Sequence, residues 1–366
     1  MTDSKAVLDL NSLARQVLQN CEISDSRHAG LYSICGLALR LRDLYKWEND
    51  LNPWVEKDSA EILEWIGVKE QRWEELIDND YDEISIFEQR YDPFDAAGIN
   101  AVLEPHGVFY GAGYAQRLKP AFFLAPIENK AMVDGFPVYT LGCELARDLL
   151  TIPALSQDCS IILRMGSARL FLWDQLIYIN KSARPALNVA LEKCGLEDKT
   201  PEALRGALDT LLETQRETYI YHELGEIRDD VFNRAVWREI IADHPHTPIE
   251  LLARAVKDLL ADTNAYGTLQ NIIKRRETAA LAFYVAFFDG LAKTLFPEIN
   301  MSFHEFVDSG DWAVIEAAVS SGHQTALHYA EELIGIHETG KKHGDGIWVK
   351  NEIQNRILKK ILPQAK

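Results

Sequence analysis

A short polar run, His222-Glu223-Leu224-Gly225-Glu226, interrupts what otherwise has the pattern of a buried helix face. The preceding apolar stripe recurs at helical spacing and then continues onto charged positions: Leu204, Leu208, Leu211, Tyr219, then His222, Glu226 and Asp229. A stripe that faces a core stays apolar unless its polar groups are paired, bind a metal or take part in chemistry. The run therefore marks the first candidate site.

His222 and Glu226 are spaced i, i+4, so both side chains can reach one ion from a single helix face. A zinc-peptidase helix has the pattern H-E-x-x-H with Glu as the base, but Glu226 stands where the second His belongs. The Glu-x-x-His motif of di-iron bundles is absent too, because Tyr219 lies three residues before His222. The pattern that remains suits a mononuclear His/carboxylate site for Zn, Mn or Fe.

Two further helices are expected to send ionisable groups to the same interior. Asp262 and Arg276 lie on the apolar stripe of the next long helix, and His323 lies on that of a later one. Helical bundles build metal sites from such groups on facing helices. The candidate metal ligands are therefore His222, Glu226, Asp262 and His323. Glu223 or Asp229 would be the catalytic base of a metal-dependent enzyme.

A buried ion-pair network explains the same residues without a metal. In it, Arg276 bridges Glu226 and Asp262, and His222 donates a hydrogen bond to a carboxylate. A small rotation of the helix would instead expose Glu223 and Glu226, since a helix drifts by about 20° per heptad. The sequence favours a ligand-binding or protein-interaction module with a structural polar core, and leaves the metal-dependent enzyme as the alternative.

The elements that must position these groups are mostly helices. Apolar spacing predicts helices over 26–48 and 60–76. A small antiparallel β-hairpin or sheet is expected within about 105–142, where Asp134-Gly135 is a tight-turn signal. Helical patterning resumes at Glu144 and continues. The resulting fold class is mainly α.

The C-terminal half is predicted to be an antiparallel helical bundle. Thr200-Pro201 is a typical helix start, and that helix can continue to about Asp243. A capping box over 247–250 opens the next helix, which bends near 264–267 and continues to about 295, and another covers 312–337. Pro185, Gly195 and the turn after them favour a domain boundary, with an N-terminal domain over 1–195 and a C-terminal bundle over 196–366.

Composition narrows the class of partner. The net charge of −18 repels phosphate backbones and anionic membranes, so we expect neither nucleic acid nor a membrane as partner. No apolar stretch reaches the roughly 20 residues of a membrane span, and no secretory signal is evident. Five cysteines without a CxxC pair favour a reducing, cytoplasmic setting. A protein partner, a homo-oligomer and a small-molecule ligand all stay open.

Two partial motifs are set aside. The segment 78–82 resembles the start of a calcium loop, but Glu83 replaces the required glycine and Gln89 the closing Glu. Gly111-Ala112-Gly113 completes no phosphate-binding pattern, and glycine beside a strand more often marks a turn or bulge.

Several phrases together resemble a known family. They are the segments 31–36 (LYSICG), 42–47 (RDLYKW), 222–226 (HELGE), 257–263 (KDLLADT) and 283–290 (FYVAFFDG). The whole chain is similar to an uncharacterised bacterial family of the domain-of-unknown-function type, which is mostly helical with an N-terminal and a C-terminal domain. The resemblance implies two domains and carries no activity or catalytic residue.

Overall fold

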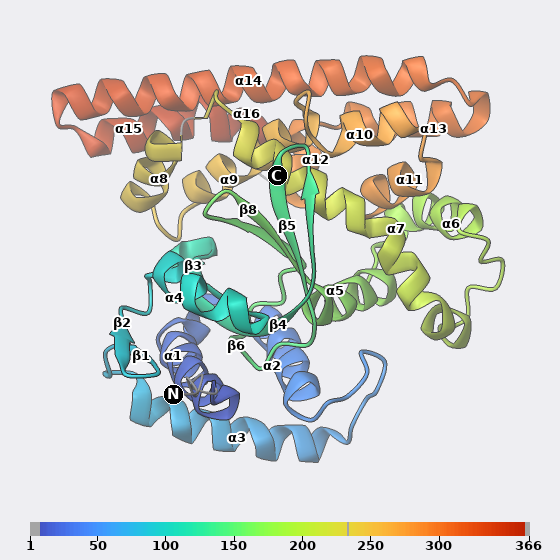
Figure 1. Cartoon of the computed structure of the whole chain (residues 1–366). Helices are drawn as coiled ribbons and strands as arrows, with labels where there is room; N and C mark the ends of the chain where they lie inside the picture. The colour runs from blue at the N-terminus through green and yellow to red at the C-terminus, as the bar shows by residue number, and fades with distance from the viewer. Residues whose placement is uncertain (1–7, 233, 363–366) are drawn as a thin grey trace. The chain divides into compact units, whose positions relative to one another are not determined.

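The computed structural model describes residues 8–232 and 234–362, apart from the side chain of Gln116. The chain divides into two compact units, Met1–Trp173 and Asp174–Lys366. The first unit combines a β-sheet with helices, whereas the described part of the second contains helices and loops (Figure 1).

Four helices of the first unit begin after an Asp or Ser whose side chain accepts a hydrogen bond from the first turn: α1 (Leu10–His28), α2 (Ile34–Glu48), α3 (Ser59–Leu76) and α4 (Ala96–Leu103). The first part of α5 (Met165–Ile177) also belongs to this unit. The Ser33 hydroxyl accepts a hydrogen bond from the Gly36 amide and starts α2, so the helix predicted over 26–48 is two helices. The helix predicted over 60–76 is confirmed as α3.

The first unit contains a six-stranded mixed sheet, so the prediction of a mainly α fold with only a small hairpin is wrong. Its strands are β3 (Val108–Tyr114), β4 (Pro120–Val133), β5 (Phe136–Leu141), β6 (Ala146–Arg147), β7 (Ala154–Gln157) and β8 (Ser160–Arg164). They are ordered β3-β4-β5-β8-β7, and β6 pairs with β4. The β5–β8 pair is parallel and the others are antiparallel. A separate hairpin joins β1 (Ile84–Ile86) and β2 (Gln89–Tyr91).

The error comes from residues 146–164, which were included in the predicted helical region but form strands. The run Ile161-Ile162-Leu163 in β8 is fully buried and continuous, so it lacks the alternation that identifies a half-exposed strand. A short buried apolar run cannot be distinguished from a helix segment by periodicity. Its strand character depends on pairing with β7, which a turn of two residues joins to it, and with β5, which lies further back in the chain.

The turn between β4 and β5 confirms the sequence signal. Asp134 and Gly135 both have positive φ, 48° and 89°, as a tight turn of the primed type requires. Gly111 lies in β3 and serves packing: a Cβ there would lie 1.9 Å from the Phe123 ring. Helices α1 and α4 cover this sheet through Leu13, Ile99 and their apolar neighbours.

Helices of the second unit follow the predicted caps and breaks in part. They are α6 (Arg184–Lys193), α7 (Pro201–Arg228), α8 (Arg234–Asp243), α9 (Pro248–Thr263), α10 (Thr268–Arg275), α11 (Thr278–Phe287), α12 (Gly290–Leu295), α13 (Glu298–Ser309), α14 (Trp312–His343), α15 (Gly346–Ile353) and α16 (Lys359–Ile361). The long α14 packs along α9, α13 and α15 (Figure 1). Helix α9 also contacts α7, α8, α10 and α12, which makes it a central element of the unit.

Two differences from the predicted boundaries affect the site. The helix expected to continue to about 243 ends at Arg228, because Asp229 takes an extended backbone and its carboxylate accepts from the Val231 amide. The break near 264–267 is confirmed between α9 and α10. The helix predicted to continue to about 295 also breaks at Arg276, whose φ is 57°.

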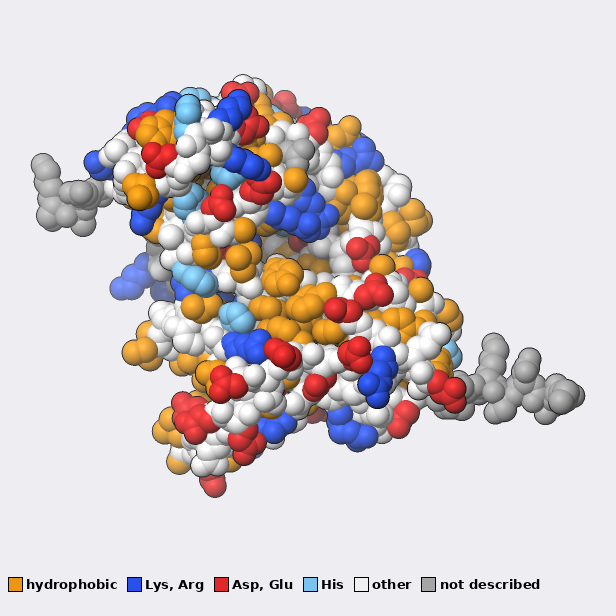
Figure 2. Space-filling view, turned by 90° about the vertical axis from the view of Figure 1, so that its left-hand side faces the viewer, with side chains coloured by type: hydrophobic (Ala, Val, Ile, Leu, Met, Phe, Trp, Pro, Cys, Tyr) orange, Lys and Arg blue, Asp and Glu red, His pale blue; other side chains and the backbone are white. Residues whose placement is uncertain are grey.

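Surface charge is mixed on the face shown in Figure 2. There, Lys and Arg side chains alternate with Asp and Glu, and the described residues form no continuous basic patch on that face. Across residues 8–232 and 234–362, no helix combines the length and the apolar character that crossing a membrane demands.

Candidate metal centre

Helices α7 and α9 cross in backbone contact at one glycine. A Cβ on Gly225 would lie 2.1 Å from the carbonyl oxygen of Ala261, so no larger residue fits without moving a helix. The Asn264 side-chain amide donates to the Gly225 carbonyl at 2.9 Å and closes the crossing. His222 and Glu226, which flank this glycine on α7, therefore face the acidic side of α9.

His222 is oriented by a carboxylate on α9. Its Nδ1 lies 2.8 Å from Oδ1 of Asp262, and the Tyr284 hydroxyl of α11 donates to Oδ2 of Asp262 at 2.9 Å. Burial lowers the pKa of His222, but attraction to Asp262 outweighs it and raises that pKa well above its usual range. The Nδ1–H of His222 therefore donates to Asp262, and Nε2 is left to interact with other groups.

The Nε2 atom of His222 faces Glu226, and Asp258 completes a group of three possible donors. It lies 3.9 Å from Oε1 of Glu226, and ligand atoms of His222, Glu226 and Asp258 all lie within 4.8 Å of one another. These side chains are part-buried, with His222 30 % and Glu226 21 % exposed, so an ion from solvent can reach them. Donors around a bound zinc ion are about 3.4 Å apart, so small side-chain rotations would close the group onto an ion.

Lys257 on α9 already pairs with Glu226, through Oε2. Its ammonium also lies 4.9 Å from the centroid of the Trp237 ring. Burial raises the pKa of Glu226, but attraction to Lys257 and to His222 outweighs the effect of burial. The pKa of Glu226 is therefore lowered. Lys257 is therefore one cation that the cluster already holds.

Carboxyl groups outnumber the cations around the crossing. Glu223 is 8 % exposed, and no hydrogen bond or ion pair joins its carboxyl to another described residue. Burial, followed by repulsion from Glu226, raises the pKa of Glu223 to about 7. Burial likewise raises the pKa of Asp258 to about 6, with attraction to His222 opposing it and repulsion from Glu226 adding to it. Both carboxyls favour the arrival of another cation.

The structure places the other predicted residues away from this group. The His323 ring on α14 lies 3.1 Å from the Thr263 hydroxyl through Nδ1. Asp229 caps the turn after α7, as described above. Arg276 pairs with Glu316 on the surface, so Lys257 takes the place that the ion-pair network assigned to Arg276. The predicted hydrogen bond from His222 to a carboxylate is present.

Sequence reasoning missed Asp258, Lys257 and Tyr284. Asp258 and Asp262 are spaced i, i+4 on α9, as His222 and Glu226 are on α7, so two matching pairs were available as a signal. No local signal distinguishes Tyr284, which lies in a continuous apolar segment.

A second buried charged cluster, also missed, lies in the first unit. Lys119 is 1 % exposed, and its ammonium lies 2.9 Å from Asp25 and 3.1 Å from Asp148. Asp25 also accepts from the Leu149 amide. Nearby, Arg164 pairs with Glu144 at 3.1 Å, and Glu144 also accepts from the Ser167 hydroxyl. The paired charges hold the loop before β7 in place.

Two family models match this chain. One is the N-terminal domain of a family of unknown function (DUF6866), over residues 12–164, and the other is the C-terminal domain of the same family, over residues 169–357. No curated protein and no solved structure matches the chain. The two-domain resemblance seen in the sequence is thereby confirmed, with no activity attached. The chain belongs to the DUF6866 family of unknown function.

Proposed function

We propose that the second unit binds a divalent cation between α7 and α9. The ligands are Nε2 of His222 and the carboxylates of Glu226 and Asp258. The observation that carries the proposal is the pairing of His222 Nδ1 with Asp262, because metal-binding histidines almost always donate the other ring N–H to such a partner. Tyr284 extends this support by bonding Asp262 in turn.

Charge balance supports a cation at this position. Glu223, Glu226, Asp258 and Asp262 surround His222 and Lys257, and two of these carboxyls have no partner among the described residues. In a purely structural ion-pair network these two carboxyls lower the cost of their burial by taking up protons, as their raised pKa values indicate. A bound dication would compensate them.

The donor set narrows the choice of metal. One imidazole and two carboxylates suit Zn, Mn or Fe, whereas calcium takes 6–8 oxygen ligands and magnesium keeps most of its waters. Lys257 competes with the ion for the charge of Glu226, and its ammonium also lies near the face of the Trp237 ring, which attracts a cation.

Metal analysis and titration of the full chain test the proposal. After chelation and dialysis, we expect one equivalent of Zn²⁺ or Mn²⁺ to bind with Kd below about 10 µM by calorimetry. His222→Ala and Asp258→Asn should abolish binding. His328→Ala is the matched control, because His328 is 69 % exposed on α14. Binding that is absent from the wild type, or unchanged in both variants, would refute the metal and favour the structural network.

A metal-dependent hydrolytic enzyme is a second candidate, favoured by Glu223. This carboxyl is buried beside the proposed ligands and lacks a partner among the described residues, as a group that takes up a proton would. In this case Glu223→Gln should keep metal binding but lose hydrolysis of a nitrophenyl ester. A metal-loaded wild type without such activity would leave the binding module as the function.

A further inference from the structure

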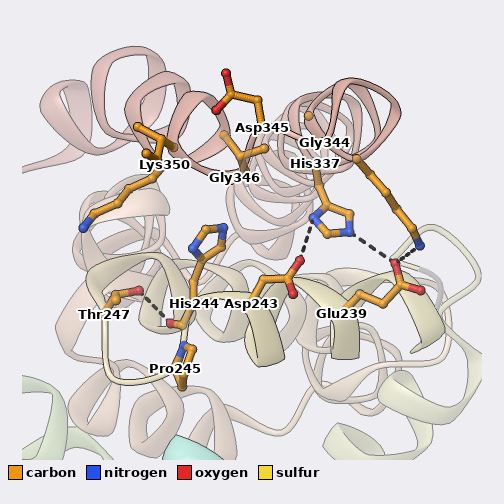
Figure 3. A pocket seen from close by; sticks show the side chains of 14 residues that line it. Glu239, Asp243, His244, Pro245, Thr247, His337, Gly344, Asp345, Gly346 and Lys350 are labelled. Carbon is orange, nitrogen blue, oxygen red and sulfur yellow. Dashed lines mark hydrogen bonds and ion pairs between the residues drawn. The ribbon is translucent and has the colours of Figure 1, made fainter.

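A separate cavity of about 700 Å³ lies in the second unit, between the loop after α8 and the turn from α14 to α15. Figure 3 shows the His244 ring rising from that loop toward Gly346 and Asp345. Its volume is in the range of small-molecule sites, and none of its lining residues belongs to the proposed metal centre.

The loop that carries His244 is fixed from both sides. The Thr247 hydroxyl donates to the His244 carbonyl at 2.7 Å, and the fully buried Glu250 accepts from the His246 amide at 2.9 Å. The predicted capping box is thus rearranged, with Glu250 bonding one residue earlier than Thr247. The backbone that carries His244 is therefore held in place before any ligand arrives.

The carboxylates around the cavity are already used. Glu239 pairs with Lys341 and with His337 Nε2, and Asp243 lies 3.9 Å from His337 Nδ1. Asp345 caps α15 by accepting from the Trp348 amide. A cationic ligand would therefore find these three groups partnered.

Two nitrogen-bearing side chains of this lining make no side-chain hydrogen bond or ion pair with a described residue. One is His244, a residue that is only 8 % exposed, and the other is Lys350, whose side chain is exposed to solvent. A polar side chain more than nine-tenths buried is normally hydrogen-bonded. Burial lowers the pKa of His244, so its ring is neutral at pH 7 and donates a single N–H. Lys350 supplies the positive charge.

Apolar groups line the cavity beside these two side chains. Val349 seats tightly because Gly340 on α14 leaves room for it: a Cβ on Gly340 would lie 1.9 Å from its side chain. Ile347 is 76 % exposed at the rim, and Pro245 lies beside His244.

We infer that this cavity is a binding site for a small organic anion, a monocarboxylate with an apolar chain. The carboxylate lies between the His244 ring and the Lys350 ammonium, and the chain lies along Ile347 and Val349. This assignment stands apart from the metal centre and does not depend on it.

Calorimetry of the full chain with acetate, butyrate, hexanoate and inorganic phosphate, at constant ionic strength, tests the site. We expect affinity to rise from acetate to hexanoate, by up to about fourfold for each buried methylene. Lys350→Met should weaken hexanoate binding by about tenfold or more, while Lys342→Met, an exposed neighbour, should not. His244→Ala should match Lys350→Met. His246→Asn is the control for His244, because Asn tolerates the positive φ of that position.

The outcomes separate cleanly. Hexanoate binding weaker than about 10 mM, equal binding of acetate and hexanoate, or binding of phosphate alone would each overturn the proposal. Equal hexanoate binding by the wild type and Lys350→Met would do the same. A shift of the His244 ring signals on adding hexanoate, without one for His246, would support it in the folded wild type.

Discussion

The imidazole of His222 on α7 is bound to the carboxylate of Asp262 on α9, with Nδ1 and Oδ1 2.8 Å apart. Forty residues separate them in the chain, and the contact exists because Gly225 allows the two helices to touch. With Nδ1 held by Asp262, Nε2 of His222 faces Glu226, 3.9 Å from its Oε1. Everything proposed for the metal centre depends on this orientation.

Asp262→Asn should weaken the binding of Zn²⁺ by about 10- to 100-fold, because a neutral amide supports the ligand imidazole less than a carboxylate does. Tyr284→Phe should have a smaller effect in the same direction, since it removes only the hydrogen bond to Oδ2 of Asp262. Calorimetric titration of the folded variants measures both. Unchanged affinity in Asp262→Asn would show that Asp262 has no role in holding the ligand.

Lys257→Met should strengthen metal binding by about tenfold, because it removes the cation that competes for Glu226. Lys274→Met is the matched control, since Lys274 is exposed on α10. Competition with a fluorescent zinc chelator gives the affinities. Weaker binding in Lys257→Met than in the control would contradict the proposed competition.

Gly225→Ala should destabilise the protein by about 1–3 kcal/mol, since the new Cβ would lie 2.1 Å from the Ala261 carbonyl oxygen. It should also weaken metal binding, because α7 and α9 must separate. Gly206→Ala on the same helix meets no atom within 4 Å, and it should stabilise by roughly 0.5–1 kcal/mol. Urea unfolding of the two variants compares them. Equal free energies of unfolding for Gly225→Ala and Gly206→Ala would show that α7 and α9 are not in tight contact at Gly225.

Lys119→Met should cost about 3–5 kcal/mol of stability, because Asp25 and Asp148 lose their buried cation. Lys130→Met is the control, since that side chain is half exposed on β4.

The stability of Lys119→Met should also depend more strongly on pH than that of the wild type. Burial, against attraction to Lys119, raises the pKa of Asp25 from its usual 3.8 to about 6. A carboxyl whose pKa is higher in the folded state binds a proton there more firmly, so its contribution to stability is lost as pH rises through about 6. The loss of stability of Lys119→Met relative to the wild type should therefore be larger near about pH 8 than near about pH 5. A smaller deficit at the higher pH would contradict the assignment.

Local signals predicted some features of the fold and missed others for definable reasons. The turn at Asp134-Gly135 and the helix start at Thr200 follow from backbone preferences of single residues, and both are present. The strand β8 cannot be predicted in this way, because its buried run Ile161-Ile162-Leu163 fits the core face of a helix equally well. Its pairing with β5 is what makes it a strand. The predicted mainly α class was wrong at that point.

The sequence by itself determined that His222 and Glu226 share one face of a helix, because four residues make about one turn. It also determined that a polar group on an apolar stripe needs a partner. Only the tertiary structure decided which partners these are. Asp258, Asp262 and Lys257 face α7, whereas His323 bonds to Thr263, because the crossing at Gly225 sets the register and rotation of α9. Helical spacing specifies a face, and packing alone specifies what that face meets.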